Sequence, residues 1–470
     1  MMGCRVSPGV GAWRAGVRLR ACASILALIL ASSWSSWSWS QGGANPGQFD
    51  DLFEGELDID IEKEVVRSAP PKIAVPAARQ IDGAEGAEGE LIAEILRFDF
   101  EITGLFSPTD PKSFKDFEAS EGFTADQINY DRWQQEGVEY LVKARTRQVA
   151  KEIELEMAFF QISRREQLEV KWKPHATDPE QLRQAVHGFA NAVVEHMTGS
   201  KGVFGTRLVL AGQEGQAKNI FVMDIDGARR VKMSNNRSIN VLPTWAGGGG
   251  VYFTSYVRDN PDLYFTKGEE ARVVSAVPGT NHGAATCGDR IAVTLSMGST
   301  NTDIYLLDPQ SGRIKARLTN HWGIDTSPSW SPDCSQIAFV SDRGGTPQIY
   351  LMDASGGDQR RLTFSGRNNT TPEWSPKGDE IAFTGYVSTG TDIFITTLGG
   401  FMRRLTHCRS YCEDPTWSPD GNYIAFIGQK DEERPQLYIS PVNISRSHKT
   451  LITREGGSWG TPSWERESPR

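Results

Sequence analysis

The second half of the chain repeats one short unit six times, at spacings of 40 to 46 residues. Three markers recur in the same order in each unit. The first is an apolar strand of the "IAF" type, which starts at Leu208, Val251, Ile291, Ile337, Ile381 and Ile424. The second is a polar residue followed by an aliphatic residue and an aromatic ring, at Asn219, Asp262, Asp303, Gln348, Asp392 and Gln436. The third is "RLT" or a relative, at Val231, Val273, Leu318, Leu362, Leu405 and Ile452. A repeat of this length indicates a solenoid, a propeller or an array.

A further strand opens most units with the pattern Pro-x-Trp, at Trp245, Trp330, Trp374 and Trp417. The third unit has lost this pattern, at "NHGAATCGD" (281–289). Four short strands joined by Gly, Asp and Pro turns are typical of one propeller blade. A twisted sheet of that size must bury its faces against neighbouring blades.

The two ends of the repeat region indicate how the ring closes. The first unit lacks a Pro-x-Trp strand, and an extra one, "TPSW", stands at 461–464. We expect this C-terminal strand to complete the first blade. The sequence therefore predicts an all-β, six-bladed propeller over residues 201–470.

Residues 91–200 have the pattern of a small α/β domain. "EYLVKARTRQV" (139–149) and "EIELEMAFFQIS" (152–163) alternate as strands, with Ile153, Leu155, Met157 and Phe159 on one face. The fold class is thus two-domain, a small α/β N-terminal domain followed by the propeller.

The clearest helix of this domain follows Thr177. Asp178 can cap it, Pro179 suits its first turn and Gly199 can end it. The predicted buried stripe consists of Leu182, Ala185, Val186, Phe189, Val193, Val194 and Met197. His187 and His196 lie on this helix, and we interpret both as structural.

The first 40 residues have the features of a secretory signal peptide. Four arginines and no acid precede the apolar run "ACASILALILA", which is too short to span a membrane stably. We expect cleavage near Gln41 and export of a soluble protein to the periplasm that does not span the membrane.

An acidic, flexible segment is predicted between the signal peptide and the α/β domain, over residues 41–90. Within it, "ELDIDIEKEVV" alternates apolar and acidic residues, which predicts an unpaired strand that binds another surface. A calcium loop is not favoured, because the turn glycine of such a loop is missing.

Charge and cysteine content exclude several classes of protein. The net charge of −9 is unsuited to nucleic acid, which binds mainly through Lys and Arg. Cys408 and Cys412 can close a disulfide, whereas Cys334 is interpreted as a turn substitution. No cofactor is predicted and no metal site, since His407 with these two cysteines lacks a fourth ligand.

Two motifs that can indicate catalysis are better explained by turns. "GGSWG" (456–460) matches the hydrolase nucleophile elbow at Ser458, but no Asp and His follow it in order. "GGGG" (247–250) stands where sister units have a hairpin turn, without the Lys of a phosphate loop. No catalytic residue is predicted, and the chain is not expected to be an enzyme.

The combination resembles the TolB family, the periplasmic propeller proteins of the Tol-Pal envelope system. "SWSPDCSQIAFVSDRGG", "QIYLMDASGGDQRRLT" and "TWSPDGNYIAF" are similar to its repeats. More specific are "APPKIAVPA" (69–77), "LRFDFEITGLFSP" (96–108), "GVEYLVKARTR" (137–147) and "AVHGFANAVVEHMTGSKGVFGTRLVLAG" (185–212), which match its N-terminal domain in order. The resemblance covers about residues 56 to 470.

The resemblance implies a non-enzymatic adaptor that supports outer-membrane integrity and constriction at cell division. Its propeller would bind the Pal lipoprotein, its N-terminal segment would bind TolA, and other outer-membrane proteins are further partners. The implied TolA contact is Glu56, Leu57, Asp58, Ile59, Asp60 and Ile61. The implied Pal contact, on loops entering the inner strands, is Asp325, Thr326, Asn369, Thr370, Glu413 and Asp414.

Two alternatives stay open from the residues alone. One is a propeller related to those of dipeptidyl peptidase or prolyl oligopeptidase-type serine peptidases, which share similar repeats. The other is a propeller that binds a sugar or another small ligand.

Overall fold

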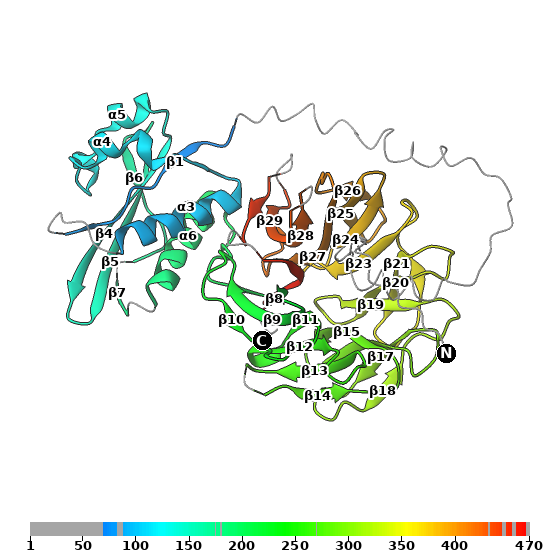
Figure 1. Cartoon of the computed structure of the whole chain (residues 1–470). Helices are drawn as coiled ribbons and strands as arrows, with labels where there is room; N and C mark the ends of the chain where they lie inside the picture. Colours follow the sequence, from blue (N-terminus) through cyan, green and yellow to red (C-terminus); the bar gives the residue numbers. More distant parts are fainter. Residues whose placement is uncertain are drawn as a thin grey trace, which may run out of the picture. The chain divides into compact units, whose positions relative to one another are not determined.

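The computed structural model describes residues 69–81, 88–173, 175–178, 181–268, 270–430, 433–443, 448–453 and 457–466. All of them belong to one unit of the chain, Phe49–Arg470. The predicted signal peptide and the predicted TolA-binding strand at 56–61 lie outside the described residues. Figure 1 shows the α/β domain in blue and cyan and the repeat region from green to red.

The α/β domain is built on one mixed sheet whose long central hairpin is formed by the two predicted strands. Its strands are β1 (Lys72–Ala74), β2 (Arg79–Gln80), β3 (Ser107–Pro108), β4 (Tyr140–Val149), β5 (Glu152–Gln161), β6 (Glu166–Leu168) and β7 (His175–Thr177). The order is β3-β1-β4-β5-β6, with β2 also paired to β4 and β7 to β5. β1 pairs in parallel with both β3 and β4.

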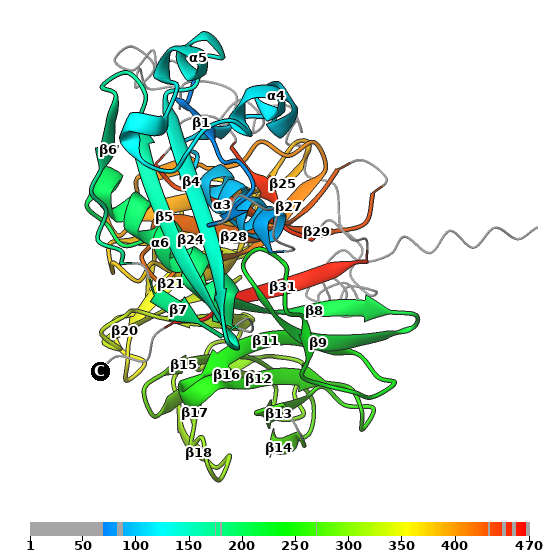
Figure 2. The same ribbon diagram turned by 90° about the vertical axis from the view of Figure 1, so that its left-hand side faces the viewer.

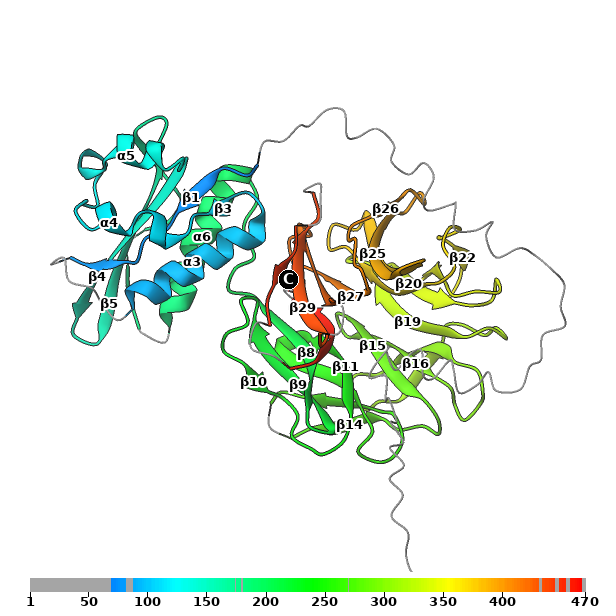
Figure 3. The ribbon, with the colours of Figure 1, turned by 45° about the horizontal axis from the view of Figure 1, so that its top comes forward.

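Two apolar cores flank this sheet because β5 alternates. Ile153, Leu155, Met157 and Phe159 face α3 (Gly89–Thr103) and α6 (Leu182–Thr198), as predicted. Ala158 and Phe160 face the other core, with Phe114 and with Trp133 of α5 (Tyr130–Gln135). The short α4 (Lys115–Glu118) and the 3-10 turns Pro111–Ser113 and Ala125–Gln127 complete that side (Figure 3).

The structure corrects the predicted start of this domain and one residue of the buried stripe of its main helix. β1 and β2 belong to the α/β sheet, although the sequence predicts a flexible segment over residues 41–90. α6 begins at Leu182 after Gln181, whose backbone N–H donates to the carbonyl of Asp178 at 2.8 Å. Gly199 ends the helix in the left-handed conformation, as predicted, but Met197 is exposed because it lies in the last turn.

The repeat region forms a β-propeller of four-stranded antiparallel units. The strands are β8 (Arg207–Glu214), β9 (Ala217–Asp224), β10 (Val231–Lys232); β11 (Asn240–Ala246), β12 (Gly250–Ser255), β13 (Asp262–Thr266), β14 (Arg272–Ser275); β15 (Asn281–Cys287), β16 (Arg290–Leu295), β17 (Asp303–Leu307), β18 (Ile314–Arg317); β19 (Asp325–Trp330), β20 (Gln336–Ser341), β21 (Gln348–Asp353), β22 (Arg360–Arg361); β23 (Asn369–Trp374), β24 (Glu380–Val387), β25 (Gly390–Thr397), β26 (Met402–Arg404); β27 (Tyr411–Trp417), β28 (Tyr423–Gln429), β29 (Gln436–Pro441), β30 (Thr450–Leu451); and β31 (Trp459–Trp464). A single parallel pair, Thr391 with Tyr411, joins the units β23–β26 and β27–β30 into one sheet.

The C-terminal strand completes the first unit. β31 pairs antiparallel with β8, which gives the order β10-β9-β8-β31 and confirms the predicted pairing (Figure 2). Trp464 is fully buried, and its indole N–H donates to Oγ1 of Thr206 at 2.8 Å. The inner strands contact one another in a cycle, β31, β11, β15, β19, β23, β27 and back to β31.

Three of the four Pro-x-Trp tryptophans, Trp245, Trp330 and Trp417, join neighbouring units. The indole N–H of Trp245 donates to the carbonyl of Ser463 at 3.0 Å, and that of Trp417 donates to Glu373 at 2.9 Å. In the third unit, Thr286 occupies the register position of the tryptophan, pairing with Ile291 as Trp330 pairs with Ile337. Oγ1 of Thr286 donates to the carbonyl of Trp245 at 2.9 Å, so the third unit keeps a hydrogen bond to the second without an indole.

A disulfide between Cys287 and Cys334 joins the third unit to the fourth, with the two Cα atoms 5.9 Å apart. The indole N–H of Trp330 joins the same two units, because it donates to the carbonyl of Ala285 at 3.2 Å. The interpretation of Cys334 as only a turn substitution was therefore incomplete. Its φ of 60° does match that turn role, since Gly378 and Gly421 take positive φ in the equivalent turns. No sequence pattern indicated the partner, because 47 residues separate the two cysteines.

The α/β domain and the propeller share one buried core. Phe100 and Ile102 of α3 belong to the same apolar cluster as Tyr423, Leu437 and Trp464 of the propeller. The imidazole Nε2 of His448 also hydrogen-bonds the carbonyl of Glu101 at 2.7 Å. A shared apolar core of this kind holds two domains in a defined arrangement.

Candidate functional site

A buried polar clamp explains two of the three repeat markers. In five units, the backbone N–H of the aliphatic residue that follows the recurring polar residue donates to the hydroxyl of a Ser or Thr that follows the fourth strand. The pairs are Ile220–Ser234, Ile304–Thr319, Ile349–Thr363, Ile393–Thr406 and Leu437–Thr453, at 2.9 to 3.1 Å. The same hydroxyl donates to the side chain of the recurring polar residue, as Thr363 does to Gln348 at 2.8 Å. The recurring polar residue and the Thr of "RLT" are therefore partners.

A second clamp holds the loop that enters each inner strand. Asn369, the first residue of β23, donates through its side-chain amide to the carbonyl of Ser365, four residues earlier, at 2.8 Å. Asn281 donates in the same way to the carbonyl of Val277, whereas the amide of Asn240 donates to the side-chain oxygen of Asn236. If the loop moved away, the buried side-chain amide would lose its hydrogen-bond partner, which costs free energy. These contacts therefore fix the loop conformation.

Asp325 occupies the clamp position at the start of β19. Its carboxylate accepts two hydrogen bonds from the guanidinium of Arg343, at 2.9 and 2.8 Å. Burial raises the pKa of Asp325, while its hydrogen bonds and the charge of Arg343 oppose that rise. One charged nitrogen thus contacts both carboxylate oxygens, and these charge-assisted bonds offset part of the cost of burying the carboxylate.

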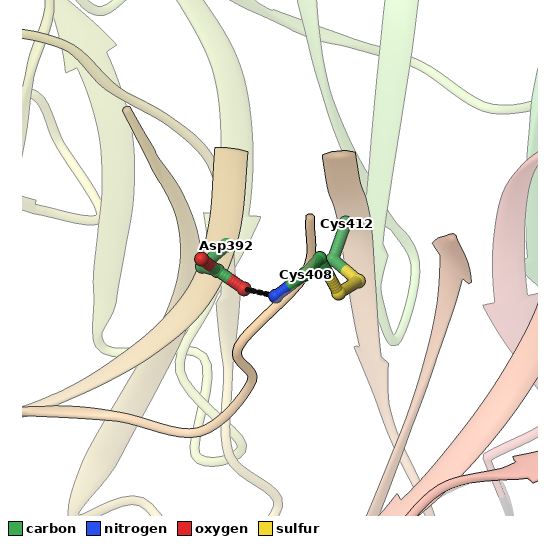
Figure 4. A group of neighbouring side chains, drawn as sticks. All are labelled: Asp392, Cys408 and Cys412. Carbon is green, nitrogen blue, oxygen red and sulfur yellow. Dashed lines mark hydrogen bonds between the residues drawn. A yellow bond between two sulfur atoms is a disulfide. The ribbon is translucent and has the colours of Figure 1, made fainter. Parts of the chain in front are cut away.

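A disulfide takes the clamp position at the start of the last inner strand before β31. Cys412 pairs with Gly428 as Asn369 pairs with Gly385, and it is bonded to Cys408, four residues earlier (Figure 4). The backbone N–H of Cys408 donates to the carboxylate of Asp392 at 2.8 Å. The Cys408–Cys412 bond thus does covalently what the asparagine amide does by hydrogen bonding in the neighbouring unit.

Every inner strand carries a bulge at one register position. The residue in the bulge has positive φ, between 46° and 66°, at Leu242, Gly283, Ser327, Thr371, Asp414 and Thr461. The strand register shifts there in each unit. A non-glycine residue in this conformation costs about 1 kcal/mol, so five such residues indicate a constraint from the ring.

Hydrogen bonds between neighbouring units stabilise these bulges. The N–H of Leu242 donates to Oγ1 of Thr461 at 3.2 Å, and the N–H of Asp414 donates to Oγ1 of Thr384 at 3.1 Å. The carboxyl of Asp414 accepts from the backbone of Thr461. Burial, and next the charge of Glu413, raise the pKa of Asp414 to about 7. This carboxyl therefore exchanges its proton near neutral pH.

The residues predicted to contact Pal differ in their roles and exposure. Asp325, Thr326 and Asn369 are buried, whereas Thr370, Glu413 and Asp414 are half-buried. The last of the three predicted pairs, Glu413 and Asp414, was also placed one residue too late in the chain. By register, Asp325 and Asn369 correspond to Cys412, and Glu413 corresponds to Thr326 and Thr370.

A second cluster of buried ionisable groups lies between the α/β domain and the propeller. His187 of α6 is only 1% exposed, and its Nδ1 donates to Oδ2 of Asp99 on α3 at 2.8 Å. Its Nε2 lies 3.6 Å from Oδ2 of Asp226, in the propeller turn after β9. Arg183 of α6 also pairs with Asp226. The structural role predicted for His187 is thus a buried ion pair that reaches both domains.

The pKa values of this pair are shifted upward together. Burial alone would lower the pKa of His187, but the charge and hydrogen bond of Asp99 and the charge of Asp226 raise it above 6.5. Burial raises the pKa of Asp99 to about 6, against the opposing effect of His187. His187 is therefore the group that holds a proton near neutral pH.

Two groups of the described residues bring three metal-binding side chains together, and neither fits a metal ion. Asp392, Cys408 and Cys412 form one group, but both sulfurs are in the disulfide. His187, Asp224 and Asp226 form the other, but Arg183 and Arg229 already neutralise the two carboxylates. A cation at the second group would have to displace a guanidinium from each carboxylate.

The rejected catalytic motifs have the structural roles expected for turns. Ser458 lies directly before β31, so a strand follows where the nucleophile elbow needs a helix. Residues 247–249 form a short turn between β11 and β12, which pair antiparallel. None of the helices in the described part of the chain is long and apolar enough to cross a membrane.

Comparison with known proteins agrees with this architecture. Residues 57–168 match the family model of the TolB amino-terminal domain, and residues 194–467 match that of the TolB beta propeller domain. The Tol-Pal system protein TolB of Anaeromyxobacter dehalogenans is 34% identical over 268 residues, which cover 56% of this chain and 60% of that protein. The protein TolB homolog of Chlorobium luteolum is 32% identical over 196 residues, covering 40% and 43%. The chain thus matches about three fifths or less of the length of these relatives.

A solved structure has the same fold. The crystal structure of TolB from Acinetobacter baumannii covers 85% of this chain and 98% of its own, with a TM-score of 0.71 and 24% identity. The fold and its repeated clamps define the chain as a β-propeller protein with a preceding α/β domain. It belongs to the TolB family.

The equivalence of the disulfide and the asparagine clamp can be tested by substitution. C408S/C412S should lower the free energy of unfolding by about 2 kcal/mol, because a cross-link closing so short a loop restricts the unfolded chain by that amount. C408S/C412N places an amide where Asn369 stands in the neighbouring unit and should recover part of the loss in equilibrium urea unfolding. Equal stability of the two variants would contradict the equivalence.

The charge of His187 can be tested by removing Asp99. In Asp99→Asn the pKa of His187 should fall, because its largest raising cause is gone and burial remains. In the wild type, the stability due to His187 is complete below pH 6.5 and lost as pH rises through the folded pKa. That loss should shrink in the variant. Imidazole NMR titration and urea unfolding from about pH 6 to about pH 9 measure both effects.

The matched control is Glu94→Gln, which removes an exposed carboxylate from the same helix. It should leave the titration of His187 unchanged. An unchanged titration in Asp99→Asn would show that Asp99 does not hold the proton on His187.

Proposed function

We propose that the chain is a non-enzymatic component of the Tol-Pal system in the periplasm, exported by a cleaved signal peptide. The observation that carries this proposal is the match to both TolB domains, in order, along one chain. The relatives named as Tol-Pal system proteins support it. The function we propose is to bind Pal and TolA and so support outer-membrane integrity and constriction at division.

We also propose that the propeller is six-bladed and closed. The pairing of β31 with β8 and the cyclic contacts of the inner strands support it. The proposed domains are 1–40 for the signal peptide, 41 to about 70 for the acidic segment, about 71–200 for the α/β domain and 201–470 for the propeller. The early strand β1 supports the shift of the second boundary.

Pal is proposed to bind at the end of the propeller where the loops enter the inner strands. Thr370, Glu413 and Asp414 remain candidates for contact because they are half-buried. Asp325 and Asn369 are buried in the loop clamps, so their proposed role is to position the loops. TolA is proposed to bind residues 56–61 by strand addition.

The division of labour can be tested with the mature protein. Deleting residues 50–64 should abolish capture of TolA and leave capture of Pal intact, because the two sites lie on separate parts of the chain. Pull-down with purified TolA and Pal measures this. Loss of both partners would contradict the proposed division, and failure of the intact protein to bind either would contradict the function.

A further inference from the structure

The end of the propeller that carries the clamped loops also carries its most exposed aromatic side chains. In each unit the first strand runs away from the loop before it, the second returns and the third runs away again. The loops entering the inner strands and the hairpins between second and third strands therefore share one end. The turns between third and fourth strands lie at the other end.

Three consecutive loops at this end form what we call the loop-tip surface, residues 320–324, 364–368 and 407–411. Trp322 and Phe364 are each 74% exposed, more than any other large apolar residue among those described. Exposed aromatic rings on neighbouring loops are uncommon on a surface that contacts only water. Trp and Tyr anchors with Arg dominate binding energy at protein interfaces.

The charge of this surface is opposite to that of the chain as a whole. The three loops contain no Asp or Glu but carry exposed Arg367, His407 and Arg409, while the chain has a net charge of −9. The guanidinium of Arg361 lies 5.1 Å from the ring centre of Phe364. Asp342, from a hairpin at the same end, accepts the N–H of Ile324 at 2.7 Å and so serves to hold the first loop.

The loops are held in place before any partner arrives. The first is fixed by Asp342 and by the amide of Asn301, which donates to the carbonyl of His321 at 2.6 Å. The second is fixed by Asn369 and the third by the Cys408–Cys412 disulfide. A surface fixed in advance loses less conformational entropy when it binds.

From this geometry we infer that the loop-tip surface binds an acidic face of a folded protein, with Trp322 and Phe364 entering apolar pockets that carboxylates surround. Arg367 and Arg409 pair with those carboxylates at the rim. The inference rests on the proposed function and deepens it, because it assigns the partner contact to loop tips outside the six residues predicted from sequence. It also gives the buried clamps a positioning role.

The test is binding of the full mature protein to the purified soluble domain of Pal, measured by titration calorimetry. Trp322→Ala/Phe364→Ala should weaken binding about tenfold or more, because both rings are anchors. The control is Phe401→Ala, which removes a ring that is 52% exposed in the turn between β25 and β26, at the opposite end. Unfolding by urea should be unchanged in all of these variants, since the rings are exposed.

Charge-reversal variants test whether the two arginines at the rim contribute to binding. Arg367→Glu/Arg409→Glu should weaken binding by about tenfold at low salt and less at high salt, whereas Arg313→Glu, in the turn between β17 and β18, should not. Equal binding by the aromatic variant and the wild type would overturn the inference while leaving the proposed function standing. Absence of Pal binding by the wild type would overturn both.

A lipid surface is the other occupant that exposed Trp and Arg could suit. Cosedimentation with vesicles of equal parts phosphatidylcholine and phosphatidylglycerol measures it. No binding to vesicles supports the protein partner. Vesicle binding that Trp322→Ala/Phe364→Ala abolishes, with Pal binding retained, would overturn it.

Discussion

The propeller depends on one pairing between segments about 250 residues apart in the chain, that of β31 with β8. Without it the first unit would keep only three strands and expose an unpaired inner edge. Trp464, carried by β31, is fully buried and hydrogen-bonded to Thr206, immediately before β8. The cycle of inner strands, and therefore the relative placement of the loops at its ends, follows from this pairing.

Within the propeller, hydrogen bonds of buried polar groups determine the positions of the loops. A hydroxyl joins the third and fourth strands of five units, and an asparagine, an aspartate or a disulfide then holds the loop entering the next inner strand. These groups are satisfied inside the protein, so they cannot also be the groups that a partner touches. What remains exposed is the loop tips, and this separates positioning residues such as Asn369 from candidate contact residues such as Phe364.

The sequence was most informative where one pattern recurs. The apolar strands, the Pro-x-Trp strands and the closing role of residues 461–464 could be predicted because each unit obeys the same packing rule. The polar markers were visible too, but their partnership as a clamp required distances. The Cys287–Cys334 bond and the pairing of His187 with Asp99 could not be predicted, because each joins residues far apart whose neighbours carry no pattern. The shift of one residue at Glu413 arose because a cysteine replaced the expected asparagine.

Amide hydrogen exchange of the mature protein, with and without the soluble domain of Pal, tests the central claim most directly. Bound Pal should slow exchange in residues 320–324, 364–368 and 407–411, and leave the turns between third and fourth strands unchanged. Slowed exchange in those turns or on α3 and α6, with the three loops unaffected, would contradict the account.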